Sequence, residues 1–228
     1  DYRVLLSHTA EKAYSLLHEH EVDIIVTDVA LPGMSGVELC QTIASNFDLS
    51  HIPIIVASGI SAIDTKIACI EAGANIYIEK PFALDYLQTC IKSILEKRTN
   101  LKKAYQTPFL KVNSHQFNLR SVDEDFLQKL DDIIMQNIKD PSFSSKQIEE
   151  GLFLSRSTLI RKVKALLDTT PNNYLRVKRL SVAAELLAQG KHRINTVCFA
   201  VGLNSPSYFA KCFKDQFGVL PTDFQAKE

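Results

Sequence analysis

The stretch IIVTDVALPGMSG, residues 24–36, sets one aspartate directly after a run of apolar residues with high β-propensity. A turn-rich loop follows, with Pro32, Gly33 and Gly36. A continuous apolar run is typical of a strand that is buried on both faces of a parallel sheet. The charge of Asp28 is therefore expected at the exit of this strand, where open α/β sheets form the crevice that binds ligands.

On either side of this stretch the sequence alternates between strand and helix patterns. Short apolar runs predict strands at residues 2–6, 22–28, 52–58 and 75–80. Apolar residues at helical spacing predict helices at residues 9–20, 35–45, 63–73 and 83–97. Strands that are separated by helices in this way predict an α/β fold with a doubly wound parallel sheet.

Polar side chains stand at the ends of three predicted strands, namely Asp28, Ser58 and Lys80. The carboxyl ends of parallel strands meet at one edge of a sheet, so these side chains are expected to converge. A carboxylate can attack phosphorus, a hydroxyl can bond a phosphoryl oxygen, and an ammonium can neutralise the developing charge. The sequence therefore predicts phosphoryl transfer at this edge.

These residues, together with the Pro32-Gly33 turn and Lys80-Pro81-Phe82, resemble the response-regulator receiver domain over residues 1–98. The resemblance implies a flavodoxin-like fold in which Asp28 accepts a phosphoryl group from a sensor histidine kinase. It also implies that Ser58 and Lys80 bind the phosphoryl group.

The same resemblance implies three further features of the receiver site. Tyr77 would be the switch aromatic, and the Lys80-Pro81 peptide bond would be cis. The site would hold Mg²⁺, with Asp28 and the backbone carbonyl of Ala30 among its ligands.

One departure from the receiver pattern affects the ligands of the implied Mg²⁺ site. Receiver domains open with a strand that ends in an acidic pair, and this sequence starts at what corresponds to the second strand. We interpret the chain as an excerpt of a longer protein whose first strand is missing here, and expect Mg²⁺ only where that acidic pair is present. We expect the 228-residue chain to be phosphorylated poorly and the complete protein to be competent.

The second half of the chain differs in charge and pattern. Residues 1–107 carry 9 Lys and Arg against 13 Asp and Glu, whereas residues 108–228 carry 17 against 13. Residues 99–122 are polar with weak periodicity and predict a linker, with a short ordered piece near residues 109–112. The basic half from residue 123 onward indicates a separate domain whose partner is a polyanion.

Residues 123–228 predict an all-helical domain with clear helix starts. Ser144, Ser155, Thr170-Pro171 and Ser205-Pro206 are strong entry signals. The segments 155–165 and 205–217 each follow a short helix and a turn, and they interleave apolar with basic and hydroxyl residues. The helix at 171–188 between them would be ~27 Å long. This length suits two recognition helices that are ~34 Å, or one DNA turn, apart.

These segments, LSRSTLIRKVKAL, TPNNYLRVKRLSVAAELL and INTVCFAVGLNSPSYFAKCFKDQFGVLPTDF, resemble the AraC/XylS-type DNA-binding domain with two helix-turn-helix units. The resemblance implies base contacts from Ser157, Ile160, Arg161, Ser207, Tyr208 and Lys211. It implies phosphate contacts from Arg156, Lys162, Asn204 and Ser205. Two departures are Asp168, where a glycine is usual, and Glu149-Glu150, which place negative charge in the first unit.

Taken together, the sequence predicts a transcription factor that is controlled by phosphorylation of Asp28. The expected partners are double-stranded DNA, a sensor histidine kinase in trans or in the same chain, and a second copy of the protein. One alternative is a receiver-like domain that is not phosphorylated in this form, with constitutive DNA binding. A less favoured one is a phosphatase with Asp28 as nucleophile, and another is a helical bundle that binds protein.

Composition also bears on location. No apolar run reaches the ~20 residues that span a bilayer. Five scattered cysteines without a C-x-x-C motif are typical of reduced, buried thiols. We therefore expect a cytoplasmic protein, or the cytoplasmic tail of a hybrid sensor in the inner membrane.

Overall fold

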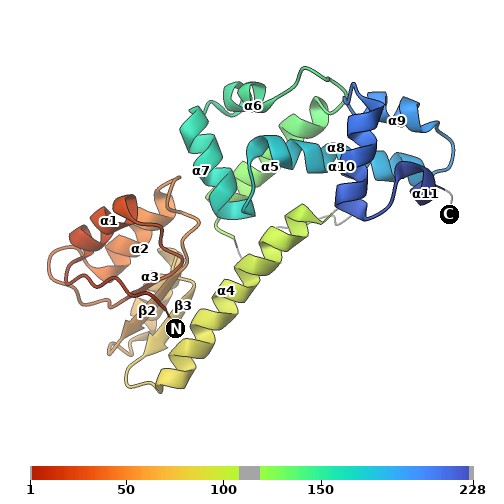
Figure 1. The fold of residues 1–228 in the computed structure, drawn as a ribbon. Helices are drawn as coiled ribbons and strands as arrows, with labels where there is room; N and C mark the ends of the chain where they lie inside the picture. The colour runs from red at the N-terminus through yellow and green to blue at the C-terminus, as the bar shows by residue number, and fades with distance from the viewer. Residues whose placement is uncertain (1, 108–118, 226–228) are drawn as a thin grey trace. The chain divides into compact units, whose positions relative to one another are not determined.

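The computed structural model describes residues 2–107 and 119–225 (Figure 1). Residues 2–100 and 119–124 form one compact unit, the N-terminal unit. Residues 101–107 and 125–225 form a second, the C-terminal unit. Helices α4 (Leu84–Gln106) and α5 (Ser121–Gln136) each have residues in both units.

The N-terminal unit is built on a parallel sheet of three strands in the order β1-β2-β3. These are β1 (Ile25–Thr27), β2 (Ile54–Ser58) and β3 (Ile76–Glu79). The register pairs Thr27 with Val56 and Ser58 with Glu79, so the three strands end at one edge. The predicted parallel sheet is confirmed.

Helices cover both faces of the sheet, as Figure 1 shows. They are α1 (Ala10–Glu19), α2 (Gly36–Ser45), α3 (Ile63–Glu71) and α4. Because side chains alternate along a strand, the fully buried strand β2 contributes to two cores. Ile54 and Val56 pack with residues of α1, α2 and α3, whereas Ile55 packs with Cys90 and Ile94 of α4.

The helix starts follow from local side-chain caps. The hydroxyl of Thr9 accepts a hydrogen bond from the Lys12 N–H at 3.2 Å. Ser35 forms a capping box with Glu38, whose carboxylate accepts from the Ser35 N–H at 2.8 Å. These bonds satisfy N–H groups that a helix leaves unpaired at its first turn, which is why the predicted starts are confirmed.

Two predicted elements are corrected. Residues 2–6 form no strand, and Val4 and Leu6 are 69% and 80% exposed. A strand needs a neighbouring backbone to complete its hydrogen bonds, and none of the described strands pairs with residues 2–6. The predicted linker at 99–122 is helical at its start, because α4 continues to Gln106 with Leu101 and Tyr105 buried. The ordered piece predicted near 109–112 lies outside the described residues.

The C-terminal unit is all-helical, as predicted. After α5 it comprises α6 (Ser145–Leu152), α7 (Arg156–Leu167), α8 (Pro171–Ala188), α9 (Ile194–Ala200), α10 (Pro206–Phe217) and α11 (Pro221–Gln225). The pairs α6–α7 and α9–α10 are the two helix-turn-helix units, with α8 between them in the chain.

The packing of this unit centres on α8. Leu180 and Leu187 of α8 lie in one core with Phe209 and Phe213 of α10, all at most 1% exposed. On the first helix-turn-helix unit, Leu159 of α7 is 0% exposed. Both helix-turn-helix units thus bury apolar side chains of their second helix.

The five cysteines are all buried and form no disulfide. Within residues 2–107 and 119–225, no helix combines the length and the apolar character that crossing a membrane requires.

Candidate functional site

The three polar strand-end residues of the N-terminal unit meet. The Ser58 hydroxyl donates to Asp28 Oδ1 at 2.6 Å, and the Lys80 ammonium donates to Asp28 Oδ2 at 2.7 Å. Asp28 follows β1, Ser58 closes β2, and Lys80 follows β3, whose parallel pairing sets these residues at one edge. The Lys80 N–H also donates to the Ser58 carbonyl at 2.9 Å, which extends the hydrogen bonding between β2 and β3 as far as the site.

The Asp28 carboxylate is strongly stabilised in its charged form. Partial burial alone would raise its pKa, but hydrogen bonds from Lys80, Ser58 and the Ala30 N–H, with the charge of Lys80, outweigh this effect. Together they lower the pKa of Asp28 from 3.8 to about 2. The carboxylate is therefore ionised at neutral pH, and 30% of its side chain remains exposed.

The loop after Asp28 depends on Glu11, to which the sequence assigned no role, and on Gly36, which the sequence placed in the turn. Glu11 of α1 accepts a hydrogen bond from the Met34 N–H at 2.8 Å. A Cβ on Gly36 would lie only 1.9 Å from the Asp28 carbonyl oxygen. Only glycine therefore lets α2 start this close to Asp28. The glycine was visible in the sequence as a turn residue, but the contact depends on how the helix packs.

Tyr77 lies on β3 beside this site. Its hydroxyl donates to the Ile60 carbonyl at 2.5 Å, in the loop that follows Ser58. The ring is half-buried, and the Lys66 ammonium lies 5.9 Å from its centroid. The Lys80-Pro81 bond is cis, as the resemblance implied.

The described residues do not by themselves fit a Mg²⁺ ion. Mg²⁺ needs six oxygen ligands in near-octahedral array. Among residues 2–107 and 119–225, no group of three or more His, Cys, Asp or Glu could hold a metal. Both carboxylate oxygens of Asp28 already accept hydrogen bonds, and Ala30 contributes its N–H to one of them at 3.2 Å.

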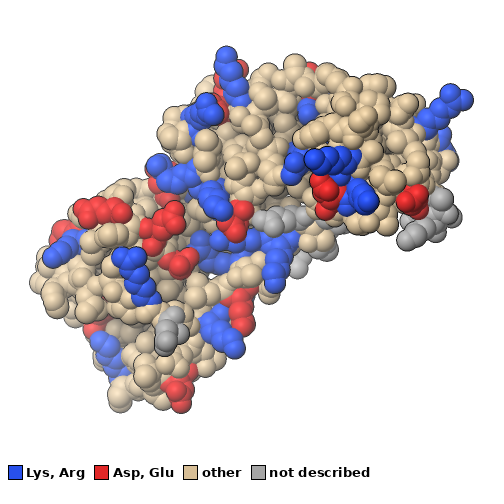
Figure 2. Space-filling model, viewed as in Figure 1, with Lys and Arg blue, Asp and Glu red and all other residues tan. Residues whose placement is uncertain are grey.

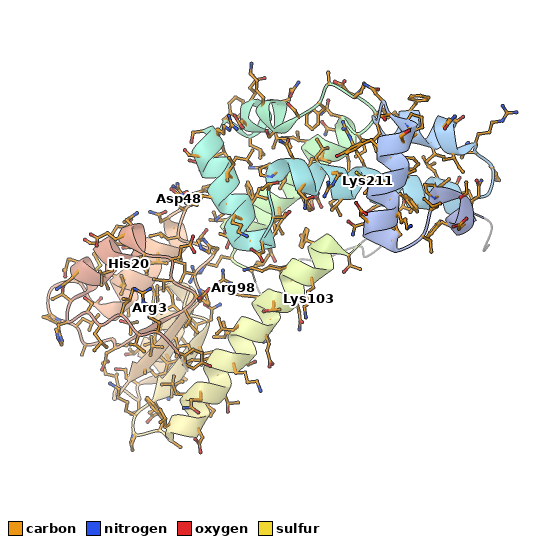
Figure 3. All side chains as sticks on the ribbon, in the orientation of Figure 1. Arg3, His20, Asp48, Arg98, Lys103 and Lys211 are labelled. Carbon is orange, nitrogen blue, oxygen red and sulfur yellow. The ribbon has the colours of Figure 1, made fainter. Side chains whose placement is uncertain are left out.

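The residues predicted to contact DNA lie in the C-terminal unit, on α7, on α10 and at the turn before α10. Those with exposed side chains are Arg156, Ser157, Ile160, Arg161, Asn204, Ser205, Ser207, Tyr208 and Lys211. Ser205 also serves as the N-cap of α10, since its hydroxyl accepts from the Tyr208 N–H at 3.3 Å. Lys211, labelled in Figure 3, belongs to α10.

Lys162 is a correction among these residues. It was predicted to contact phosphate, but it is 1% exposed, and a side chain covered to this extent presents no ammonium to a DNA backbone. Asp168 adopts the left-handed backbone with φ of 54°, where the sequence indicated a glycine position. Its carboxylate forms an ion pair with Lys164, which lowers the pKa of Asp168. Aspartate tolerates this conformation better than most residues.

The charge distribution alone does not delimit a DNA-binding face. On the face drawn in Figure 2, Lys and Arg side chains of the C-terminal unit are scattered, with Asp and Glu among them. The interface must therefore be assigned from positions on the helices.

Comparison with protein families agrees with both units. A response regulator receiver domain matches residues 1–92, and a helix-turn-helix domain matches residues 150–227. Residues 1–92 therefore hold a response regulator receiver domain, and residues 150–227 hold a helix-turn-helix domain.

Individual relatives match different shares of the chain. Histidine kinase P4 of Formosa agariphila is 34% identical over 225 residues, which are 99% of this chain and 16% of that protein. Heme response regulator HssR of Staphylococcus saprophyticus is 31% identical over 121 residues, or 53% of each chain. This chain therefore spans less than two thirds of the length of either relative. The solved C-terminal domain of AraT, a response regulator from Geobacillus stearothermophilus, is 24% identical with a TM-score of 0.43 over 45% of this chain and 85% of that one.

Proposed function

We propose that this chain receives a phosphoryl group on Asp28 and binds double-stranded DNA through its C-terminal unit, as the output of a two-component system. The observation that carries the proposal is the contact of one carboxylate with a hydroxyl at 2.6 Å and an ammonium at 2.7 Å. A partly exposed carboxylate that is ionised at neutral pH is a suitable phosphoryl acceptor. The phosphoryl donor in this proposal is a phosphohistidine of a sensor kinase.

The chemistry follows from the same contacts. An Asp28 oxygen attacks phosphorus, the P–N bond to the donor histidine breaks, and the imidazole leaves with its electron pair and takes up a proton. Lys80 and Ser58 then donate to phosphoryl oxygens in place of the carboxylate oxygens that they contact now, and so offset the added negative charge. The ligands that complete a Mg²⁺ site would lie outside the described residues.

A movement of Ser58 toward the phosphoryl group would also affect Tyr77. Ser58 is two residues from Ile60, whose carbonyl accepts the Tyr77 hydroxyl. If Ser58 follows the phosphoryl group, the loop that carries Ile60 shifts, and Tyr77 loses its present acceptor. We therefore propose that Tyr77 turns inward on phosphorylation, as the switch aromatic.

We propose that α7 and α10 read DNA bases through Ser157, Ile160 and Arg161, and through Ser207, Tyr208 and Lys211, respectively. Arg156, Asn204 and Ser205 would contact phosphates. Two copies would act together on paired half-sites, in the cytoplasm, where the free thiols are stable. The match of nearly the whole chain to 16% of Histidine kinase P4 supports an arrangement in which a kinase belongs to the same protein.

We propose an acceptor rather than a phosphatase. Phosphatases with an aspartyl nucleophile commonly use a second acid two residues on, and Ala30 stands at that position. The test incubates the complete protein and its Asp28→Asn variant with acetyl phosphate and Mg²⁺, followed by a phosphate-affinity gel. Stoichiometric labelling of the wild type alone is expected. Labelling of both proteins equally, or continuous turnover of phosphate esters, would overturn the proposal.

A further inference from the structure

A cluster of polar contacts holds the start of α5 to two loops of the N-terminal unit. Arg120, directly before α5, donates to the Ser50 carbonyl at 2.6 Å and to the Gly73 carbonyl at 2.9 Å. Asp123, in the first turn of α5, is 1% exposed and accepts from the Ser50 hydroxyl at 2.7 Å. We call Arg120, Asp123, Ser50 and Gly73 the α5 clasp. All of its residues belong to the N-terminal unit.

The α5 clasp is closely fitted. The planar guanidinium of Arg120 bonds the carbonyls of two different loops at once. Gly73 has a φ of 105°, and a Cβ there would lie 2.6 Å from the Ala44 Cβ and 3.5 Å from Arg120 Nε, so the guanidinium lies against the Gly73 backbone. Burial lowers the pKa of Arg120, and the charge of Asp123 opposes this effect. Because these contacts support one another, a shift of one loop disturbs the whole cluster.

Helix α5 continues from the α5 clasp into the C-terminal unit. From Asp125 onward its residues belong to that unit, and Phe126, Leu127 and Leu130 are at most 4% exposed. Each turn of an α-helix is hydrogen-bonded to the next, so a restraint on the first turn acts on the turns that follow. The α5 clasp therefore restrains a helix that buries apolar side chains in the C-terminal unit.

Helix α3 connects the α5 clasp with the loop beside Asp28. It starts three residues after Ile60, whose carbonyl accepts the Tyr77 hydroxyl. At its other end, the Gly73 N–H donates to the Ile70 carbonyl at 2.9 Å. A displacement of α3 therefore carries the Gly73 carbonyl with it, and this carbonyl is one of the two that Arg120 binds.

The contacts of α3 indicate that it can move at low cost. Its N-cap, Ala62, forms no side-chain hydrogen bond, and Cys69 is its buried residue. Ile63, Ile67 and Ile70 are 66%, 49% and 49% exposed. Helix α2, by contrast, has a capping box and several buried side chains. Elements with few buried apolar contacts are the ones that open or shift most readily.

We propose that the α5 clasp is an autoinhibitory contact. When it is closed, it restrains α5 and lowers the affinity of the C-terminal unit for DNA. Phosphorylation of Asp28 shifts α3, which withdraws the Gly73 carbonyl from Arg120 and opens the α5 clasp. The phosphoryl group does so because its contacts with Ser58 and Lys80 favour the open state. This inference rests on the proposed function.

The first experiment measures DNA affinity without phosphorylation, by fluorescence anisotropy on a duplex selected with the complete protein. We expect Arg120→Ala to bind about fivefold or more tightly than the wild type. A merely structural contact gives the opposite result, because its loss weakens binding or leaves it unchanged. Ser50→Ala removes only the hydroxyl that Asp123 accepts, and it should tighten binding by a smaller factor.

Arg3→Ala is the matched control, because it removes an exposed guanidinium of the same unit outside the α5 clasp. Its affinity should equal that of the wild type. Circular dichroism checks that each variant folds. Ser50→Ala is the milder change and decides the outcome if Arg120→Ala does not fold.

The second experiment adds acetyl phosphate and Mg²⁺ to the complete protein. The affinity of the wild type should rise to that of Arg120→Ala, whereas Arg120→Ala, labelled to the same extent, should change less than about twofold. Hydrogen exchange reports on the α5 clasp itself, because the Asp123 and Glu124 N–H groups donate to the Arg120 carbonyl at 2.9 and 3.0 Å. These two amides should exchange faster in the labelled wild type.

The outcomes separate the inference from the proposed function. The autoinhibitory role is overturned if unlabelled Arg120→Ala binds no more tightly than the wild type, or if it keeps the full response to labelling. Unchanged exchange at Asp123 and Glu124 in the labelled wild type overturns it as well. If the wild type is not labelled, the proposed function fails, and the comparison of the unlabelled proteins alone decides on the α5 clasp. If neither protein binds a duplex, both are wrong.

Discussion

The proposed function places two requirements on Asp28, which must be charged and also open to a phosphoryl donor. Lys80 and Ser58 each hold one of its oxygens, while 30% of its side chain stays exposed. The electrostatic stabilisation therefore comes from partners that can also bind the phosphoryl group. The resting site already contains the groups that would hold the product.

The lowered pKa of Asp28 predicts a pH effect on stability. Its folded pKa of about 2 lies below its ordinary value of 3.8, so its contribution to the free energy of unfolding is complete above pH ~4. That contribution is lost as the pH falls through about 2. Urea unfolding of the wild type and Asp28→Asn should give a stability difference that shrinks between pH ~4 and ~2. A difference that is constant over this range would contradict the assigned contacts.

Gly36 offers a second prediction at the residue scale. In Gly36→Ala the new Cβ would meet the Asp28 carbonyl oxygen at 1.9 Å, so α2 must move away from the site. We expect a loss of about 1–3 kcal/mol in the free energy of unfolding, measured by urea denaturation, and reduced labelling of Asp28. Gly59→Ala is the matched control, since a Cβ there meets nothing within 4 Å. Equal stability of both variants would show that α2 does not approach Asp28 as described.

Arg161 of α7 is the third residue with a specific expectation. If it reads a base edge, Arg161→Ala costs about 1–3 kcal/mol of binding free energy and relaxes preference at one base position. Arg156→Ala, at a proposed phosphate contact, should weaken all sequences alike. Binding to a randomised duplex library measures both effects. A uniform loss in Arg161→Ala would assign that residue to the backbone instead.

Among the elements, the start of α5 is tied to the loops that precede two strands. Arg120 donates to the Ser50 carbonyl at 2.6 Å and to the Gly73 carbonyl at 2.9 Å. The Ser50 hydroxyl donates to Asp123 at 2.7 Å. Helix α4 is held in a similar way, since Arg98, labelled in Figure 3, donates to the Asp23 carbonyl at 2.8 Å. These contacts lie at the edge of the sheet opposite to Asp28.

Arg120→Ala should therefore loosen the edge of the sheet that lies away from Asp28. It leaves the part-buried carbonyls of Ser50 and Gly73 without this donor, which we expect to cost about 1–3 kcal/mol in the free energy of unfolding. Hydrogen exchange should become faster around Ser50 and Gly73, and Arg120→Lys should restore only part of the protection, because an ammonium lacks the planar fork. Unchanged amide exchange around Ser50 and Gly73 in Arg120→Ala would show that Arg120 does not stabilise these loops.

Elements with local signals could be predicted from the sequence. Thr9, Ser35, Ser155 and Ser205 each cap the helix that was expected after them, because a cap depends on a few neighbouring residues. The convergence at Asp28 was also predictable, because parallel strands end at one edge. The strand predicted at residues 2–6 was wrong for the opposite reason, because strand formation depends on a partner that is distant in the sequence.

Other features required the packed structure. The polar sequence after residue 98 suggested a linker, yet Leu101 and Tyr105 are buried on one side of α4. The resemblance implied a phosphate contact for Lys162, although its position on α7 is 1% exposed. The α5 clasp joins residues of two loops to the start of α5, and these segments are far apart in the sequence.

At the scale of the whole molecule, the proposal requires that phosphorylation alters DNA binding. The two activities lie in different units, and α4 and α5 each contribute residues to both. A phosphoryl group changes the equilibrium between two states only if it interacts differently with each. The contacts of Ser58, Lys80 and Tyr77 are the ones that would differ.

The most direct test measures DNA affinity by fluorescence anisotropy on a duplex selected with the complete protein, before and after incubation with acetyl phosphate and Mg²⁺. Asp28→Asn, treated identically, is the control. We predict that labelling changes the affinity of the wild type by about fivefold or more and leaves that of Asp28→Asn unchanged. An affinity that stays the same at full labelling, or that changes equally in Asp28→Asn, would contradict the account.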